Sequence, residues 1–371
     1  MDKKRVIIAG GGIGGAQLVA KLQGKADIVL VDPKEYFEVP MAAPREMVNP
    51  DFSNRAVIPY GDFLKAGRHV QGKMVNVFPD HISVEKNDST LQELPYDFLI
   101  IATGSKYRSD LVKADSGSVE ERYSHYDTLK KQIDDANRIL IIGGGPVGVE
   151  ISSEILEVNP EKKLTLVHSG SRLLDASSSK TATRAAAHLK GKRATIVFDE
   201  KVVDNHESDV VTGPKTATTD KDRKIEFDLL LWCIGARHDT SYMNENYGDV
   251  LDENGRIKVE KNFLVEGQSN IFALGDVTAL KETKLAAWTT MHVPVVLKNI
   301  LILIENPGTD HNKLKRYKAK TGNEMMLVAL GPKNGAGTMP WGDFLGDLTA
   351  KKLKAKDMLV GMYRKKVGVP K

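Results

Sequence analysis

The hydrophobic pattern of the chain begins with an apolar run that stops at a glycine cluster. Residues 5–9 (RVIIA) are followed by the loop GGGIGG at residues 10–15 and by an amphipathic stretch over residues 16–22. This order predicts a buried strand, a tight turn and a helix. Gly10, Gly12 and Gly15 have the G-x-G-x-x-G spacing. That spacing lets bare backbone approach a pyrophosphate at the N-terminus of the helix.

A second apolar run, residues 28–31, ends in Asp32, which stands 22 residues beyond Gly10. A carboxylate at this place accepts hydrogen bonds from the hydroxyls of an adenosine ribose. Strand, glycine spacing and acid together predict a dinucleotide site, in preference to a glycine turn without a ligand. A loop is predicted over residues 33–40 and a short helix over residues 41–48. Arg45 on that helix either neutralises a phosphate or is a solvated side chain.

The opening pattern repeats 133 residues later. Residues 138–142 predict a second buried strand, and residues 149–156 predict a second helix. Between them Gly143, Gly145 and Gly148 repeat the glycine spacing. Two complete strand-loop-helix units predict a protein that binds two dinucleotides, one in each of two Rossmann-like domains.

The second unit differs at the end of its next strand, residues 164–167. His168 stands there in place of an acid, and Arg172 follows on the same loop. Without a carboxylate to repel a 2′-phosphate, NADPH is expected to be tolerated as well as NADH; alternatively, both residues only solvate the loop. Glu150, just inside the second helix, either stabilises the positive end of that helix or contacts the nicotinamide side of the cofactor.

The rest of the pattern places two further strand ends beside these loops. A buried strand over residues 96–101 ends at Ala102, Thr103 and Gly104, and a strand over residues 229–234 ends at Gly235. Alternating segments between residues 69 and 93 predict antiparallel strands, and residues 208–224 predict a surface hairpin. The polar residues 105–120 predict a crossing between domains.

Another strand end carries the residues Gly275 and Asp276. An aspartate at this place is expected to bond the polyol chain of a flavin. The helix that follows, over about residues 284–305, would direct its N-terminus at the flavin ring. His292 on that helix is either a proton donor or a histidine bonded to a neighbour.

Length and composition suit a protein of two or three domains. The chain has 371 residues, of which 41% are hydrophobic and 27% charged, as in soluble globular proteins. The first residues leave no room for a signal segment, Asp2 excludes N-myristoylation, and residues 293–304 are too short to span a bilayer. A cytoplasmic location, peripheral on an intracellular membrane or free, is expected.

The chain has one cysteine, Cys233, so it forms no internal disulfide and holds no redox-active cysteine pair. Because Cys233 lies in an apolar run, a core position is favoured over a nucleophile.

The C-terminal residues 351–371 are strongly basic. They hold eight Lys or Arg and one acid, a net charge of +7, whereas the whole chain is +4 and the remainder therefore −3. The basicity is accordingly expected to be confined to this tail. Its interleaved apolar residues suit an amphipathic contact with anionic lipid; the alternative is a solvated basic tail over ordinary core packing. No motif of a nucleic-acid-binding fold is present.

These residues together resemble the flavoproteins of the pyridine nucleotide-disulfide reductase type. Within that group the chain resembles the ferroptosis suppressor protein family, also called apoptosis-inducing factor 2, and most closely its plant-type members. The matching segments are residues 32–38, 102–104, 143–150, 160–168, 270–276 and 356–361. The resemblance implies an α/β fold with a discontinuous FAD domain (1–105 and 236–305), an inserted NAD(P)H domain (106–235) and a C-terminal α+β cap (306–371).

The activity implied by the resemblance is that of type II NADH dehydrogenases. Hydride passes from NADH or NADPH to non-covalent FAD, and a lipid quinone of the ubiquinone or vitamin K type is reduced at a membrane surface. By this resemblance the catalytic residues are Glu150, Lys354 and Leu359, where animal members have an aromatic residue in place of Leu359. The cofactor-binding residues are Gly10, Gly12, Gly15, Asp32, Arg45, Ala102, Thr103, Gly104, Gly143, Gly145, Gly148, Glu150, His168, Arg172, Gly235, Gly275 and Asp276.

Two other functions stay open at this point. One is a reductase of a soluble protein partner such as ferredoxin, which would dock on the basic tail. The other is a nucleotide-sensing interaction protein in the manner of apoptosis-inducing factor. No residue is assigned to a metal, no nucleic-acid partner is expected, and a homodimer is left open.

Overall fold

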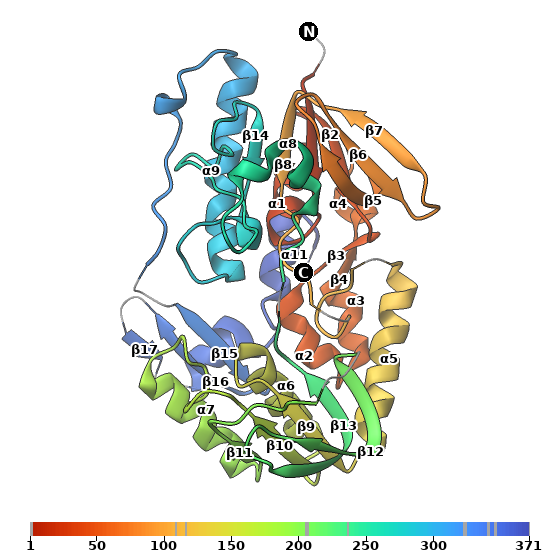
Figure 1. Ribbon diagram of the computed structural model, residues 1–371, viewed down its shortest axis with the longest axis vertical. Coiled ribbons are helices and arrows are strands. Elements are labelled where there is room, and N and C mark those ends of the chain that lie inside the picture. The colour runs from red at the N-terminus through yellow and green to blue at the C-terminus, as the bar shows by residue number, and fades with distance from the viewer. Residues whose placement is uncertain are drawn as a thin grey trace.

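The computed structural model describes residues 3–107, 110–115, 117–204, 208–235, 237–321, 325–339, 342–344 and 347–370. Two sheets lie toward opposite ends of the long axis, and a smaller sheet lies beside the second of them (Figure 1). The chain passes from the first sheet to the second and back before it forms the small sheet.

The larger sheet holds the first glycine loop. Its order is β14 (Ile271–Ala273), β8 (Phe98–Ile101), β1 (Arg5–Ala9), β2 (Asp27–Asp32), β5 (Arg68–Val77), β6 (His81–Lys86) and β7 (Leu91–Pro95). The pairs from β14 to β5 are parallel, and β6 and β7 pair antiparallel. The unbroken apolar run of β1 is typical of a central parallel strand that is covered on both faces. The antiparallel strands expected between residues 69 and 93 are confirmed.

The second sheet holds the second glycine loop. Its order is β11 (Thr195–Val197), β10 (Lys163–Val167), β9 (Arg138–Ile142), β13 (Lys224–Trp232) and β12 (Val210–Thr218). The central strand β9 pairs in parallel with both β10 and β13. Strands β12 and β13 pair antiparallel, so the expected hairpin is confirmed.

The helices after the two loops have the predicted places. Helix α1 (Ile13–Leu22) follows β1, and α6 (Pro146–Val158) follows β9. Further helices of these two units are α2 (Ala43–Glu46), α3 (Ser53–Ala56), α4 (Tyr60–Phe63), α5 (Val119–Asp135), α7 (Ser179–Gly191) and α8 (Asn244–Tyr247).

The prediction of a loop over residues 33–40 is wrong in one part. It contains the short strand β3 (Tyr36–Glu38), which pairs antiparallel with β4 (Val57–Pro59). The strand forms because Tyr36 and Phe37 are both fully buried in the described molecule. Burial of two aromatic rings stabilises an ordered segment where the sequence shows no clear period.

The small sheet joins the two units. It consists of β15 (Met326–Leu330), β16 (Asn334–Met339) and β17 (Gly342–Phe344), and is followed by α10 (Asp347–Ala350), a π-helical turn (Lys351–Ala355) and α11 (Val360–Val367). Strand β15 packs on α6 and β16 on α7, whereas α11 packs on α1. The C-terminal segment therefore contacts both glycine-loop units. The domain boundaries given above stay a prediction.

Helix α9 (Ala286–Glu305) is longer than the apolar stretch that the sequence suggested. It has 20 residues and a mean hydropathy of 1.5, so by length and composition it is a candidate membrane span. The stretch over residues 293–304 is thus part of a longer helix, but length and composition alone do not make this helix a membrane span. Half of its apolar window is buried inside the molecule, where it packs along α1. A core helix of a soluble protein has the same properties.

Candidate active site

The first glycine loop is shaped by close packing at two positions and is open at a third. A Cβ at Gly10 would lie 2.5 Å from the carbonyl oxygen of Ala102, and one at Gly15 would overlap the carbonyl oxygen of Gly10. A Cβ at Gly12 or at Gly104 would meet no atom within 4 Å in the part of the chain that is described. The loop thus offers bare backbone to a pyrophosphate in the way the spacing predicts.

The second glycine loop repeats this geometry. A Cβ at Gly143 would lie 2.5 Å from the Ile234 side chain, and one at Gly148 would overlap the carbonyl oxygen of Gly143. At Gly145 and at Gly235 a Cβ would meet no described atom within 4 Å. The two loops therefore share one steric design, which fits two dinucleotides.

Asp32 lies beside the first loop, at the carboxyl end of β2. Its Oδ2 accepts a hydrogen bond from Gly11 N at 2.6 Å, and its Oδ1 accepts from the backbone N and the Nζ of Lys34, both at 2.9 Å. The carboxylate is almost fully buried, so Lys34 neutralises it. A ribose hydroxyl would have to share or displace the Lys34 ammonium.

Tyr60, which sequence reasoning missed, closes the outer side of the same loop. A Cβ at Gly11 would overlap its hydroxyl, and that buried hydroxyl lies beside the Asp32 carboxylate. Burial raises the pKa of Tyr60, and the neighbouring Asp32 raises it further. Tyr60 and Lys34 thus both contact the carboxylate that is expected to hold the ribose.

Asp276 lies on a turn of 3-10 helix after β14. Its Oδ2 accepts from Ser105 Oγ at 3.0 Å, and Lys113 Nζ lies 3.9 Å from the same oxygen. Burial lowers the pKa of Lys113, while the charge of Asp276 opposes that shift. Sequence reasoning missed Lys113 because it read the crossing segment as a simple connection. The neighbouring Thr103 has its hydroxyl bonded to the Tyr242 hydroxyl at 2.8 Å.

Two of the predicted catalytic residues form a buried ion pair. Glu150 Oε1 lies 2.6 Å from Lys354 Nζ and also accepts a hydrogen bond from Ala329 N at 2.7 Å. Lys354 donates in addition to the carbonyl oxygen of Leu327 at 3.0 Å. Both side chains are less than a tenth exposed. Helix α6 is thereby joined, through its fifth residue, to the small sheet and to the π-helical turn.

A second buried ion pair lies one helical turn further along α6. Arg45 contacts Glu154 through Nη2–Oε1 at 2.6 Å and Nε–Oε2 at 3.2 Å, and its Nη1 donates to the carbonyl oxygen of Lys356 at 3.0 Å. Burial raises the pKa of Glu154, and Arg45 opposes that shift. The alternative of a solvated Arg45 is wrong, because the side chain is 6% exposed. A phosphate would have to compete with Glu154 for it.

Helix α6 therefore presents two buried carboxylates, each paired with a cation from another part of the chain. Arg45 comes from the unit of the first glycine loop, and Lys354 comes from the C-terminal segment. Residues at positions i and i+4 share one helix face. Three segments of the chain thus meet at this face of α6.

Leu359 lies at the N-cap of α11, with its backbone N bonded to Asp357 Oδ1 at 3.1 Å. Met358 and Leu359 have φ of 51° and 67°, in the left-handed region that residues other than glycine rarely adopt. Leu359 is partly buried against the core of the first unit. The chain thus holds this residue in a strained turn between Lys354 and α11, a feature typical of functional sites.

The tail is less amphipathic than the sequence suggested. Of its apolar side chains, Met358, Val360 and Tyr363 are at most 1% exposed, and they belong to the core. Leu353 and Met362 are 43% and 40% exposed. This arrangement favours the alternative of a basic tail over ordinary core packing.

The argument for tolerance of NADPH rested on the lack of a carboxylate near His168, and this premise is wrong. His168 Nδ1 accepts from Gly144 N at 3.2 Å, so its Nε2 carries the proton and donates to Asp175 Oδ2 at 2.9 Å. Arg172 donates to the carbonyl oxygens of Asp175 and Ser177. An exposed carboxylate therefore stands beside His168 at the end of β10. The sequence signal for this carboxylate was Asp175 itself, seven positions after His168 on the same loop.

We expect the substitution Asp175→Asn to raise kcat/KM for NADPH relative to NADH roughly fivefold, because removing one like charge at an exposed site is worth about 1 kcal/mol. Steady-state rates with both nucleotides measure this ratio. Asp127→Asn, an exposed position on α5, is the matched control. An unchanged ratio in the Asp175 variant would show that the 2′-phosphate lies away from this loop.

His292 is bonded to neighbours, as its alternative interpretation expected. Its Nδ1 accepts from Gly275 N at 3.2 Å, so its Nε2 donates to the buried Glu282 Oε1 at 2.6 Å. Trp288, one turn earlier on α9, was missed by sequence reasoning. It is 5% exposed, and its indole N–H has no hydrogen-bond partner among the described residues.

Cys233 is a buried core residue, as expected. Burial raises the pKa of its thiol, and the neighbouring Asp209 raises it further. Because the thiolate is the reactive form, we expect iodoacetamide to modify the native protein at least about 100-fold more slowly than the unfolded chain. Mass spectrometry over time measures both rates. Equal rates would show that the β13 strand end opens readily to solvent.

Comparisons with known proteins agree with this architecture. The sequence pattern of the family described as pyridine nucleotide-disulphide oxidoreductase matches residues 4–293. Apoptosis-inducing factor homolog B of Dictyostelium discoideum is 28% identical, over 100% of this chain and 98% of its own length. Ferroptosis suppressor protein 1 of Taeniopygia guttata is 30% identical, over 98% of this chain and 96% of its own.

A solved structure shows the same fold. NDH2 from Plasmodium falciparum in complex with NADH has a TM-score of 0.72 at 15% identity, and the alignment covers 98% of this chain and 97% of that one. The expected fold class, with two Rossmann-like units, is confirmed. The resemblance to the ferroptosis suppressor protein family is confirmed as well.

Proposed function

This chain belongs to the pyridine nucleotide-disulphide oxidoreductase family, and from that premise we propose that it is an FAD-dependent NAD(P)H:quinone oxidoreductase that reduces a lipid quinone at a membrane surface. The observation that carries the proposal is the pair of open glycine loops in a chain whose one cysteine is buried. A redox-active disulfide within one chain needs two cysteines, and burial raises the pKa of the one thiol present here. Electrons from the nucleotide must therefore leave this protein to an acceptor other than a cysteine pair of its own.

FAD fits the first unit. Gly10, Gly12 and Gly15 would hold its pyrophosphate and Asp32 its ribose, while Asp276 would hold the polyol chain. The Lys113 ammonium beside Asp276 offers a positive charge there. When bound, the flavin takes two electrons as hydride and hands them to the acceptor.

The nicotinamide nucleotide fits the second unit, on Gly143, Gly145 and Gly148, with His168, Arg172 and Asp175 at its ribose end. Glu150 is the fifth residue of the helix that follows this loop, so we place its pair with Lys354 between the two cofactor regions. A buried ammonium there stabilises negative charge that develops on a reduced acceptor. Because Glu150 and the carbonyl oxygen of Leu327 both hold the Lys354 ammonium, little reorganisation is needed.

The quinone assignment derives from the resemblance to the ferroptosis suppressor protein family. Leu353 and Met362, the exposed apolar residues of the C-terminal segment, offer apolar contact for an isoprenoid chain on either side of the strained turn at Leu359.

The test is an anaerobic stopped-flow experiment on the purified flavoprotein. Adding NADH or NADPH is expected to bleach the flavin absorbance, and adding a short-chain quinone is expected to restore it. Bleaching without recovery would favour a protein acceptor or a nucleotide sensor instead. If neither nucleotide bleaches the flavin faster than oxygen restores it, the proposal fails.

A further inference from the structure

An extended segment on the outside of the molecule, residues 306–321, connects α9 to the small sheet. We call it the strap; Figure 1 shows it as a long thin run at the left edge. Leu314 is buried, and Asn299 of α9 bonds both the N and the carbonyl oxygen of Lys315, at 2.7 and 2.9 Å. Tyr317 N donates to the carbonyl oxygen of Lys261 at 2.7 Å. The strap is thus pinned to the first unit.

The strap carries a dense row of cations. Lys313, Lys315, Arg316, Lys318 and Lys320 are exposed. No ion pair joins the side-chain cation of any of the five to a described carboxylate, although the backbone N of Lys320 donates to Glu282 Oε2 at 3.2 Å. The expectation that the basicity is confined to the tail is therefore wrong. That expectation rested on the net charge of the rest of the chain, in which acidic residues elsewhere cancel the positive charge of the strap. A pinned backbone keeps these charges together without the entropy cost of ordering them at binding.

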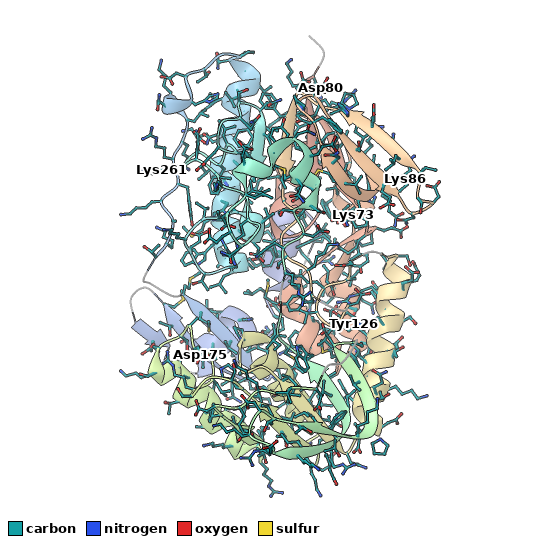
Figure 2. All side chains as sticks on the ribbon, viewed as in Figure 1. Lys73, Asp80, Lys86, Tyr126, Asp175 and Lys261 are labelled. Carbon is teal, nitrogen blue, oxygen red and sulfur yellow. The ribbon has the colours of Figure 1, made fainter. Side chains whose placement is uncertain are left out.

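A groove of about 610 Å³ lies beside the strap. Its lining includes apolar contributions from Val259, Phe263 and Leu280, and it is rimmed by Lys261, Lys281 and Lys318. Figure 2 shows Lys261 at the outer edge of the molecule. Arg316 adds a fourth cation to the lining, and Glu260 is the one acid in it.

We propose that this groove binds an anionic phospholipid, with an acyl chain along the apolar floor and the phosphate among the three rim lysines. The groove would thereby attach the protein to an acidic membrane surface. An apolar floor under a cationic rim matches an amphiphile, whereas a free phosphate makes no use of the floor. The tail offers less apolar surface to an acyl chain than the groove, since most of its apolar residues are in the core. The proposal does not depend on the redox chemistry.

Vesicle sedimentation with the purified full chain tests the proposal. Vesicles of phosphatidylcholine alone are compared with vesicles that also contain phosphatidylglycerol. Each lysine near an anionic surface strengthens binding roughly fivefold, so the triple variant Lys261→Gln, Lys281→Gln, Lys318→Gln is expected to bind roughly 100-fold more weakly. The matched control is Lys180→Gln, Lys190→Gln, Lys215→Gln, three exposed lysines of the second unit. Flavin content and thermal unfolding show that both variants fold.

The proposal is supported if only the groove variant loses binding and if short-chain phosphatidylglycerol, but not glycerol phosphate, competes for the same site. Equal loss in both variants would mean unspecific attraction of charge and overturn it. If vesicle binding is lost only when Lys352 and Lys365 are neutralised, the membrane contact lies in the tail and not in the groove. If the native protein binds no anionic vesicle, the groove is not a lipid site, and the row of cations then suits an acidic protein.

Discussion

Replacing Lys354 with methionine is expected to destabilise the protein by about 3–5 kcal/mol, because it leaves the buried Glu150 carboxylate without its cation. The double variant Glu150→Gln, Lys354→Met removes both charges and is expected to recover most of that stability. Denaturant unfolding of the two single variants and the double variant measures the coupling between the residues. Lys352→Met, two residues away and exposed, is the control and is expected to change little.

The same variants separate a structural role of Lys354 from a catalytic one. If Lys354 stabilises charge on the acceptor, reoxidation of the reduced flavin by quinone falls roughly 100-fold in both the single and the double variant. Stopped-flow reoxidation measures this step apart from reduction by the nucleotide. Recovery of the reoxidation rate together with stability in the double variant would contradict the catalytic role and leave Lys354 as the partner of Glu150 alone.

The two glycine-loop units were predictable because their signal is local. A buried strand, three glycines at fixed spacing and a helix lie within twenty residues of one another, and the third glycine of each loop has a steric reason that its neighbours in sequence create. Gly15 is packed against the carbonyl of Gly10, and Gly148 against that of Gly143. Such a motif folds in the same way wherever the sheet continues.

The pairings across α6 were not predictable from the residues alone. Arg45 and Glu154 are 109 positions apart, and a buried pair at that distance exists only once both units and their interface have formed. From the sequence, an arginine on a short helix is most simply a solvated cation. Asp175 was missed for a related reason, because the loop after β10 folds back and brings it to His168. Loops carry no period from which such a return can be inferred.

The tail shows the opposite error, in which a pattern of composition was given too much weight. Alternating lysines and apolar residues are typical of a lipid-facing helix. Here, however, Met358, Val360 and Tyr363 complete the core between α11 and α1. A pattern of alternation states that one face is apolar; only the packing states what covers that face.

The substitution Gly148→Ala is expected to abolish reduction by the nucleotide, with a loss of at least about 100-fold, while the purified protein keeps its flavin. A Cβ at this position overlaps a backbone carbonyl oxygen, which cannot move aside as a flexible side chain does. The helix must therefore separate from the strand and lose the phosphate contacts at its N-terminus. Flavin absorbance on purification and the anaerobic bleaching rate with NADH measure the two properties.

Gly15→Ala is the counterpart in the first unit and is expected to give the reverse result, a protein purified with little flavin and unfolding at a lower temperature. Gly191→Ala, at the end of α7 where a Cβ meets no described atom, is the control and is expected to be neutral or slightly stabilising.

Gly12→Ala and Gly145→Ala complete the set. They cause no clash with the described protein, so a loss of flavin in the first and of nucleotide in the second can arise only from a Cβ that meets the ligand. If Gly12→Ala keeps its flavin and Gly145→Ala keeps its nucleotide binding, the pyrophosphates lie elsewhere. The assignment of the two loops to the two cofactors then fails, although the fold is intact.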